Sequence, residues 1–237
     1  MSSPSAAAIA AVSFDVTHTL LGLPRLPEIY AAAFRRHGLP AEERDLARLI
    51  PEVWQELSCR TRLGEDRFSG HPEGSRGFWG DFVGRLAARL DLPAPSRFLV
   101  AELFDRFAHA DAWRVYPDVV PALEELASRG LALGVVSNFD ERLAGLLDDA
   151  GLGRFFTAVV TSADVGVEKP HPAIFHELIG RLELPGSAVL HVGDSRREDV
   201  EGAQGAGLAA LHLSRDGGGD IASLAELGTR LASAWTA

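Results

Sequence analysis

Hydrophobic and polar positions form two patterns along the chain, and the contrast is clearest in the second half. Several short runs are almost continuously apolar or β-branched and lead into a polar residue: AIAAVSFDV (8–16), LALGVVSNF (131–139), TAVVTSAD (157–164), AVLHVGDS (188–195) and LAALHLSRD (208–216). Such runs are typical of parallel strands that are buried on both faces. We therefore predict a β-strand in each of them.

The stretches between the later runs have apolar residues at helical spacing, and several end at glycine, as helices commonly do. They are PDVVPALEELASRG (117–130), DERLAGLLDDAG (140–151), HPAIFHELIGRLEL (171–184) and REDVEGAQGAG (197–207), and a terminal helix is expected after the glycine loop 217–219. An alternation of strands and helices predicts the α/β class with a doubly wound parallel sheet of the Rossmann type.

The connection after the first strand differs from the others. Between Leu20 and Tyr116 we find no convincing strand, only helical patterns: PEIYAAAFRRHG (27–38), RDLARLIPEVWQEL (44–57), FWGDFVGRLAARLDL (78–92) and RFLVAELFDRFAHA (97–110). About a hundred residues are far too many for a single crossover. We predict an inserted helical cap domain at residues 22–115 and an α/β core built from residues 1–21 and 116–237.

Composition narrows the possible partners. The chain has 237 residues, of which 46% are apolar, and its formal charge of −10 comes from scattered carboxylates. This argues against a nucleic acid or an anionic membrane as a partner, and no segment has the apolar length of a membrane span.

The start, MSSPSAAAIAAVSF, lacks the positive region of a signal peptide and is interpreted as a loose tail before the first strand. Cys59 is the only cysteine, so we expect a half-buried or buried thiol and a cytoplasmic location.

Polar residues that follow the predicted strands carry the candidate chemistry. Ligands bind at the carboxyl ends of strands in an open parallel sheet. The residues at those ends are Asp15, Ser137, Asn138, Lys169, Asp194 and, one helical turn further on, Asp199. Taken singly, each is a common helix cap, turn former or exposed charge. Taken together, they suit a single kind of site, one that binds a metal ion and a phosphoryl group.

Two carboxylates on neighbouring strands make an oxygen site suited to Mg²⁺, which completes its shell with water and substrate phosphate. A hydroxyl, an amide and an ammonium can bind the oxygens of a phosphoryl group, and a carboxylate can attack its phosphorus. Lys169 is the only lysine among 23 basic residues. A coding bias toward arginine could leave a single lysine at any position by accident. The alternative explanation is that position 169 needs the compact charge of an ammonium group, which a guanidinium does not supply.

Four segments, FDVTHTL, VVSNF, VEKPHP and HVGDSRREDVEGAQGAG, resemble the ordered motifs of the haloacid dehalogenase superfamily, in the subgroup with a helical cap after the first strand. The resemblance spans residues 9–213. It implies a Mg²⁺-dependent phosphohydrolase that acts on a small phosphorylated substrate. By this resemblance, Asp15 is the nucleophile and a metal ligand, Thr17 offers its backbone carbonyl to the metal, and Asp194 is the second carboxylate ligand. Asp199 holds metal-bound water or orients Lys169, and Lys169 neutralises charge between the nucleophile and the phosphoryl group. Ser137 and Asn138 lie beside the phosphoryl oxygens.

The string DVTHT departs from the pattern DxDGT of most phosphatases in this superfamily. Thr17 stands where the second aspartate would protonate the leaving oxygen, and His18 stands at the usual glycine. General acid catalysis contributes about 10² to 10⁴-fold, so the loss is large. One interpretation is a slow or selective phosphohydrolase, in which His18 or a cap residue supplies the proton. The others are a catalytically weakened binding or regulatory protein and, less favoured because GDSRRED is retained, a 2-haloacid dehalogenase.

The cap residues that set specificity are expected in the irregular stretch TRLGEDRFSGHPEGSRGFWG (61–80). We hypothesise that one or two of its basic residues contact an anionic substrate; the candidates there and just before it are Arg60, Arg62, Arg67, His71 and Arg76. Trp54, Trp79 and Phe82 are interpreted as cap core. No histidine spacing forms a zinc site, so the histidines that we considered are interpreted as structural: His109, His171, His176 and His191.

Overall fold

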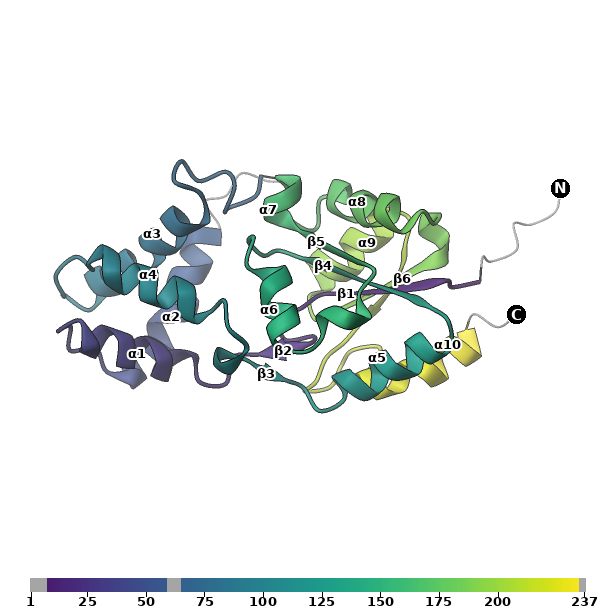
Figure 1. Ribbon diagram of the computed structural model, residues 1–237, viewed down its shortest axis with the longest axis horizontal. Helices are drawn as coiled ribbons and strands as arrows, with labels where there is room; N and C mark the ends of the chain where they lie inside the picture. The colour runs from purple at the N-terminus through teal and green to yellow at the C-terminus, as the bar shows by residue number, and fades with distance from the viewer. Residues whose placement is uncertain (1–7, 59–64, 235–237) are drawn as a thin grey trace.

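A five-stranded parallel sheet forms the centre of the α/β part of the protein. The computed structural model describes residues 8–58 and 65–234. The strands lie in the order β5-β4-β1-β6-β7 (Figure 1), with bounds Ala158–Thr161, Ala132–Ser137, Ala11–Phe14, Val189–Gly193 and Ala209–His212. All five predicted strands are therefore confirmed. Strand β1 pairs with β4 on one side and β6 on the other, so the first segment of the chain occupies the middle of the sheet.

Helices cover both faces of this sheet. One face packs against the helices α5 (Val119–Ser128), α6 (Leu143–Asp149) and α10 (Leu227–Ala234), through residues such as Leu123 and Leu146. The other face packs against α8 (Pro172–Leu182) and α9 (Gly202–Gly205), through Ile174, Phe175 and Ala203. Two separate hydrophobic clusters on opposite faces of a parallel sheet define a doubly wound fold, so the predicted fold class is confirmed.

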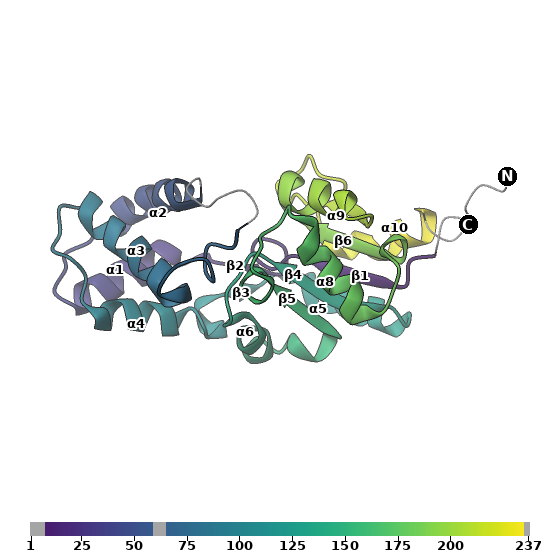
Figure 2. The ribbon, with the colours of Figure 1, turned by 90° about the horizontal axis from the view of Figure 1, so that it is seen from above.

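Four helices lie together beyond one end of the sheet, at the left of Figures 1 and 2; we call residues 23–113 the helical lobe. Its helices are α1 (Leu26–Arg36), α2 (Glu43–Ser58), α3 (Gly74–Arg89) and α4 (Arg97–Arg106). They bury a hydrophobic cluster of their own, with Phe34, Leu46 and Leu86 at its centre. The helical insertion was expected from the sequence, whereas the division into domains at residues 22 and 115 stays a prediction.

Two short strands join the lobe to the sheet, and the sequence analysis missed both. Strand β2 (Leu21–Gly22) pairs in antiparallel register with β3 (Arg114–Val115). The outgoing and returning connections therefore lie side by side. At Gly22 an added Cβ would come within 2.8 Å of the Tyr116 hydroxyl, so a larger residue there would have to push this ring away.

Arg215 fastens this junction to the rest of the α/β part. Its guanidinium donates hydrogen bonds to the backbone carbonyls of His18 and Thr19, and to both carboxylate oxygens of Asp118. It also lies 3.8 Å from the centre of the Tyr116 ring. One side chain thus connects the loop after β1, the chain returning from the lobe and the loop after β7.

The remaining helices differ slightly from those predicted from the sequence. The segment 197–207 begins as a π-helical turn, η4 (Arg196–Glu201), before it continues as α9. A short helix, α7 (Ser162–Val165), follows β5 directly, and further single turns of 3₁₀ helix are η1 (Ala110–Ala112), η2 (Gly153–Phe155), η3 (Gly186–Ala188) and η5 (Leu224–Glu226). Cys59 and the tail at residues 1–7 lie outside the described residues.

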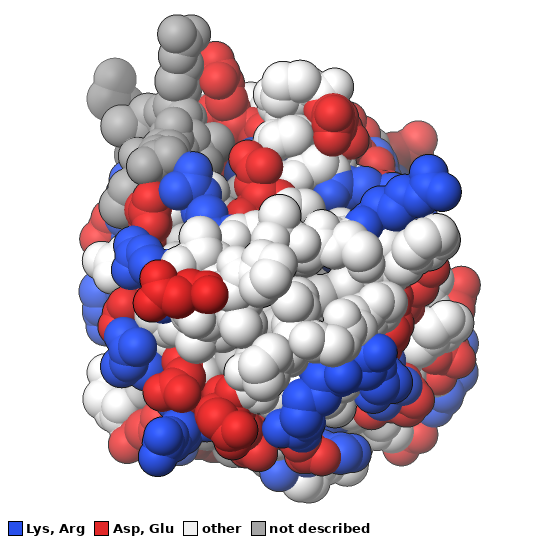
Figure 3. All heavy atoms as spheres, turned by 90° about the vertical axis from the view of Figure 1, so that its left-hand side faces the viewer, with Lys and Arg blue, Asp and Glu red and all other residues white. Residues whose placement is uncertain are grey.

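The outer face of the lobe carries charges of both signs. On the face shown in Figure 3, arginine side chains alternate with Asp and Glu side chains around an uncharged centre. Neither sign is concentrated there. Among the described residues, no helix has both the length and the apolar character needed to cross a bilayer.

We predict that Arg215→Ala lowers the free energy of unfolding by about 2–3 kcal/mol, because charged hydrogen bonds to buried or half-buried partners are lost together. Urea denaturation at neutral pH measures the change. Arg44→Ala is the matched control: the Arg44 side chain is exposed, its nearest carboxylate is 3.9 Å away, and we expect a change within about 0.5 kcal/mol. Equal effects of the two variants would contradict a structural role for Arg215.

Candidate active site

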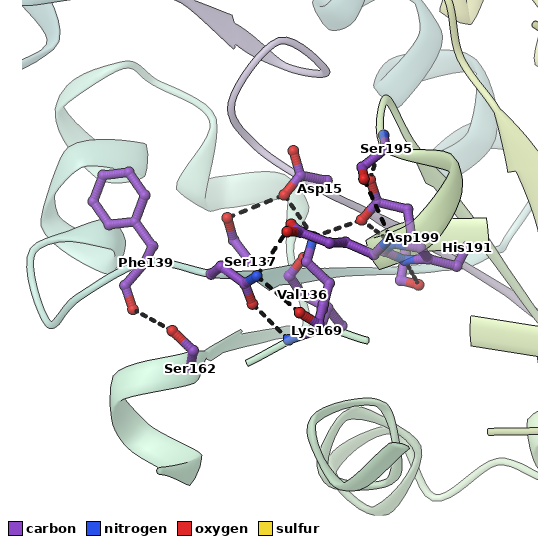
Figure 4. Close-up of polar contacts among 12 residues, drawn as sticks. Asp15, Val136, Ser137, Phe139, Ser162, Lys169, His191, Ser195 and Asp199 are labelled. Atoms are coloured by element: carbon purple, nitrogen blue, oxygen red, sulfur yellow. Dashed lines mark hydrogen bonds and ion pairs between the residues drawn. The ribbon is translucent and has the colours of Figure 1, made fainter. Parts of the chain in front are cut away.

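Residues far apart in the sequence meet at the carboxyl edge of the sheet. Asp15 directly follows β1, Ser137 ends β4, and Asp194 directly follows β6. The loop after α7 brings Lys169 to the same place, where its side chain lies between Asp15 and Asp199 (Figure 4). Five predicted site residues therefore lie at one point, because Asp199, on η4, joins this group.

Lys169 is the centre of this group. Its Nζ lies 2.7 Å from Asp15 Oδ1 and 2.6 Å from Asp199 Oδ1, and it donates a third hydrogen bond to the Val136 carbonyl at 3.0 Å. Only 1% of the side chain is exposed. All three ammonium protons are thus used, so the charge is held in one place.

Asp15 is held by two donors on one oxygen. Ser137 Oγ donates to Asp15 Oδ1 at 3.2 Å, the same oxygen that contacts Lys169. In Figure 4 the second carboxylate oxygen points away from both donors. Burial raises the pKa of Asp15, against the opposing effect of the Lys169 charge. The carboxylate is therefore fixed in orientation while one of its oxygens stays directed elsewhere.

The buried ion pair has a clear electrostatic pattern. Burial alone would raise the pKa of Asp199, but the charge of Lys169 and hydrogen bonds from His191 and Lys169 outweigh it and hold this pKa below its usual range. For Lys169, burial opposes the charged form, and the two carboxylates more than compensate, so its pKa is raised. Asp199 and Lys169 are therefore both charged at neutral pH.

His191 supports Asp199 from behind, and the sequence analysis did not assign it this position. Its Nε2 lies 3.2 Å from Asp199 Oδ1, and its Nδ1 lies 2.9 Å from Ser13 Oγ. The ring is fully buried, and burial lowers its pKa, so the neutral form is favoured. A neutral ring that donates from Nε2 accepts the Ser13 hydroxyl at Nδ1. A single histidine inside an apolar strand gives no sequence signal for this role.

A glycine allows Asp199 to reach its place. A Cβ at Gly193 would lie 2.2 Å from Asp199 Cγ, which is far inside van der Waals contact. The other Asp199 oxygen accepts the Ser195 backbone N–H at 2.9 Å. The π-helical turn η4 carries Asp199 back over the end of β6, and such turns are frequent at functional sites.

Asn138 binds the backbone of Lys169 in two ways. Its Oδ1 accepts the Lys169 N–H at 2.7 Å, and its Nδ2 donates to the Lys169 carbonyl at 3.2 Å. The same Nδ2 also lies 3.2 Å from Glu198 Oε2. Asn138 therefore positions the loop that carries the ammonium.

Asp194 completes a cluster with chemistry suited to a divalent cation. Ligand oxygens of Asp15, Asp194 and Asp199 lie within 4.8 Å of one another. Burial, together with the charges of Asp15 and Asp199, raises the pKa of Asp194 to about 7. Among the described side chains none donates a hydrogen bond or ion pair to its carboxylate. Lys169 leaves this cluster with excess negative charge, and hard carboxylate oxygens are the ligands that Mg²⁺ prefers.

The loop after Asp15 contains the departures from the phosphatase pattern. Thr17 and His18 both line the cavity next to Asp15. His18 has φ 65°, in the left-handed region that favours glycine. The histidine therefore adopts the backbone conformation expected of the glycine that it replaces, at an energetic disadvantage.

A cavity of about 580 Å³ extends from this edge of the sheet into the helical lobe. Asp15, Ser137 and Asp194 lie at one end, and Trp54, Trp79 and other side chains of the lobe line the rest. We interpreted these tryptophans and Phe82 as cap core. They do pack against one another, but all three also line the cavity, so that interpretation was incomplete.

The predicted basic residues of the lobe have different positions. Arg67 lines the cavity, whereas Arg76 and His71 do not; they pair instead with Asp105 and Asp81. Arg60 and Arg62 lie outside the described residues.

The histidines that we expected to be structural, His109, His171 and His176, are not part of the described carboxylate cluster. His171 caps α8 by accepting the Ala173 N–H.

Comparisons with known proteins agree with these motifs. A family model described as haloacid dehalogenase-like hydrolase matches residues 9–207. The chain is 33% identical over 201 residues to human "Haloacid dehalogenase-like hydrolase domain-containing protein 3", covering 83% of this chain and 78% of the human protein. It is 32% identical to "Glyceraldehyde 3-phosphate phosphatase" of Methanopyrus kandleri, covering 87% of this chain and 84% of that protein. The crystal structure of HAD phosphatase from Thermococcus onnurineus superposes with a TM-score of 0.66 at 28% identity, covering 94% of this chain and 98% of that chain.

We predict that Lys169→Arg lowers the free energy of unfolding by about 1–3 kcal/mol, because a guanidinium overfills a site whose three contacts lie at 2.6–3.0 Å. Thermal and urea denaturation measure the change. Arg48→Lys exchanges the same two residue types in the exposed pair with Glu52, and there we expect a change within about 0.5 kcal/mol. Unchanged stability of Lys169→Arg would show that the site has room for the larger group.

Proposed function

The chain belongs to the haloacid dehalogenase-like hydrolase family, and we propose that it is a Mg²⁺-dependent phosphohydrolase that forms an aspartyl phosphate on Asp15. The observation that carries this proposal is the buried ammonium of Lys169 between Asp15 and Asp199, beside the uncompensated carboxylate of Asp194. Relatives named as phosphatases support a small phosphorylated substrate. A cytoplasmic location stays a prediction from the composition.

The carboxylates of Asp15 and Asp194 and the backbone carbonyl of Thr17 would hold the metal ion. When bound, Mg²⁺ supplies positive charge for the oxygens of the phosphoryl group. The donor set fits the ion, because the cluster combines carboxylate oxygens with an excess of negative charge.

The protein's own residues divide the remaining work. Asp15 attacks phosphorus with the carboxylate oxygen that points away from Lys169, and the bond to the leaving oxygen breaks. Ser137 and Lys169, which already contact the other oxygen of Asp15, orient the carboxylate and offset the negative charge that accumulates near it. A water molecule then attacks the phosphorus of the aspartyl phosphate, and the bond between phosphorus and the Asp15 oxygen breaks. Inorganic phosphate leaves, the Asp15 carboxylate is regenerated, and the proton of the attacking water passes to solvent.

With Thr17 in place of the usual aspartate, protonation of the leaving oxygen is the slow step of this mechanism. Its hydroxyl does not act as an acid near neutral pH, so a poor leaving group departs slowly. Aryl and acyl phosphates need little protonation, and we propose that they are turned over faster than alkyl phosphates. We disfavour carbon–halogen hydrolysis because Asp194 is retained beside Asp15.

We predict that the purified protein releases phosphate from an aryl phosphate with Mg²⁺ and that EDTA stops the release. Asp15→Asn should lower kcat by at least about 10³-fold, because an amide is not a nucleophile. Asp216→Asn, at an exposed position, is the matched control with unchanged kinetics. A phosphate-release assay measures both. No release by the wild-type protein under any metal condition would favour a binding or regulatory protein instead.

We further predict that Thr17→Asp raises kcat/KM for alkyl phosphates by about 10²-fold, at the low end of the general-acid range, and raises it much less for aryl phosphates. The ratio of the two gains is the measurement, since a general structural effect would change both equally. The double variant Thr17→Asp with His18→Gly restores the usual loop residue and removes the left-handed histidine. Equal gains on both substrates would contradict the idea that the missing carboxyl limits turnover.

A further inference from the structure

The cavity beside Asp15 is much deeper than phosphoryl transfer requires. All four helices of the lobe contribute to its wall, through residues such as Leu26 on α1, Ile50 on α2, Val83 on α3 and Leu103 on α4. Its volume of about 580 Å³ lies within the range of about 300–1,000 Å³ that is typical of pockets for ligands of drug-like size. The part of the substrate that does not react therefore has a large compartment inside the lobe.

Most of this compartment is apolar, and aromatic side chains dominate it. Trp54 and Trp79 stack with ring centroids 5.8 Å apart, and Phe82 meets both rings edge to face. Phe68, Phe104, Phe107 and Trp113 also line the cavity. A wall of this kind stabilises an apolar ligand by burying its surface and offers few partners to a sugar or another highly hydroxylated group.

The two arginines of the wall are already neutralised. Arg67 is 7% exposed and binds both oxygens of Glu168, at 2.6 and 2.7 Å. Arg142 is equally buried and binds Asp140 through two nitrogens. A second anionic group on the substrate would have to displace one of these carboxylates. This revises our hypothesis that basic residues of the lobe hold an anionic substrate, as far as Arg67 is concerned.

Tyr30 supplies one polar atom that lacks a partner. Its side chain lines the cavity, and its hydroxyl makes no hydrogen bond to any described residue. The hydroxyl oxygen is not one of the buried atoms that lack a partner, so it faces the open space of the cavity. It can therefore donate a hydrogen bond to a ligand atom there, which stabilises the bound ligand.

We propose that the substrate is a phosphomonoester with a bulky, uncharged and largely apolar body, which occupies the lobe cavity and accepts one hydrogen bond from Tyr30. This inference rests on the proposed function for the phosphoryl end of the substrate. It separates this chain from a relative named for glyceraldehyde 3-phosphate, whose organic part is small and polar.

The first experiment varies the size of the substrate's apolar part while the phenol leaving group keeps nearly the same basicity. In 4-alkylphenyl phosphates with methyl, propyl or pentyl chains, the alkyl group lies too far from the ester oxygen to change its basicity much. We expect kcat/KM to rise about fourfold per added methylene until the cavity is filled. An ester whose chain ends in a carboxylate should be at least tenfold worse than the alkyl ester of equal length. A flat series, or a preference for the carboxylate, overturns the inference.

Tyr30→Phe tests the hydrogen bond with a conservative change. The substrates are alkylphenyl phosphates in which an ether oxygen replaces one methylene at successive positions. For the position that reaches Tyr30, the variant should lower kcat/KM about three- to tenfold, while the all-carbon chain changes less than twofold. Equal changes for ether and alkyl chains would show that Tyr30 acts only through packing.

Binding of the product separates this inference from the proposed function. Isothermal titration calorimetry with 4-pentylphenol, the product of the longest ester, requires no catalysis, and we expect saturable binding with a negative heat-capacity change. Val100→Glu places a charge on the cavity wall and should weaken binding at least tenfold. Phe98→Glu adds the same charge on the same helix at a side chain that is 64% exposed, and should leave binding unchanged. Circular dichroism checks that both variants fold.

The outcomes of the two experiments are distinct. If the phenol binds but no ester is hydrolysed, the proposed phosphohydrolase activity is wrong and the apolar ligand site stands. If esters are hydrolysed but the phenol does not bind and chain length has no effect, the activity stands and the inference about the substrate is wrong.

Discussion

The buried ammonium of Lys169 is the interaction on which the site depends. Its charge lies between Asp15 and Asp199, with almost no exposure to solvent, and each partner would be strongly destabilised if it were left charged and alone. Several other features serve this one contact. Asn138 holds the lysine's backbone, His191 and the Ser195 N–H hold Asp199, and the absence of a side chain at Gly193 leaves room for the carboxylate. One cation cannot neutralise three carboxylates, and the remaining negative charge makes the cluster suited to a divalent cation.

Much of this arrangement could be predicted from the sequence, because it follows from periodic patterns and from strand ends. The five strands were identified from their apolar runs, and each predicted site residue on the sheet follows from the rule that ligands bind at the carboxyl ends of parallel strands. The pair β2–β3 was missed because a two-residue strand has no periodicity. His191 was interpreted as structural, but its contact with Asp199 could not be predicted, because an imidazole within an apolar strand gives the same pattern whether it supports a buried carboxylate or only fills the core.

The cavity shows a different limit of sequence patterns. Large aromatic residues such as Trp54, Trp79 and Phe82 mark the inner side of the lobe, but the sequence does not show whether that side is filled. Only the packing of four helices determines the space that is left. The same limit applies to Arg67, whose partner Glu168 is a hundred residues away in the sequence. The proposed apolar substrate site and the missing acid at Thr17 are compatible, because a substrate held by extensive apolar contact can stay bound during a slow chemical step.

Phosphorylation of Asp15 during turnover is the step on which the proposed mechanism depends, and rapid acid quenching can detect it. Thr17 provides no base to activate the attacking water, so the aspartyl phosphate should accumulate. After mixing with Mg²⁺ and an aryl phosphate, we expect a burst of phenol equal in amount to the protein, and mass spectrometry of the digested protein should locate the phosphoryl group on Asp15. Steady phenol release with no burst and no phosphorylated Asp15 would contradict it.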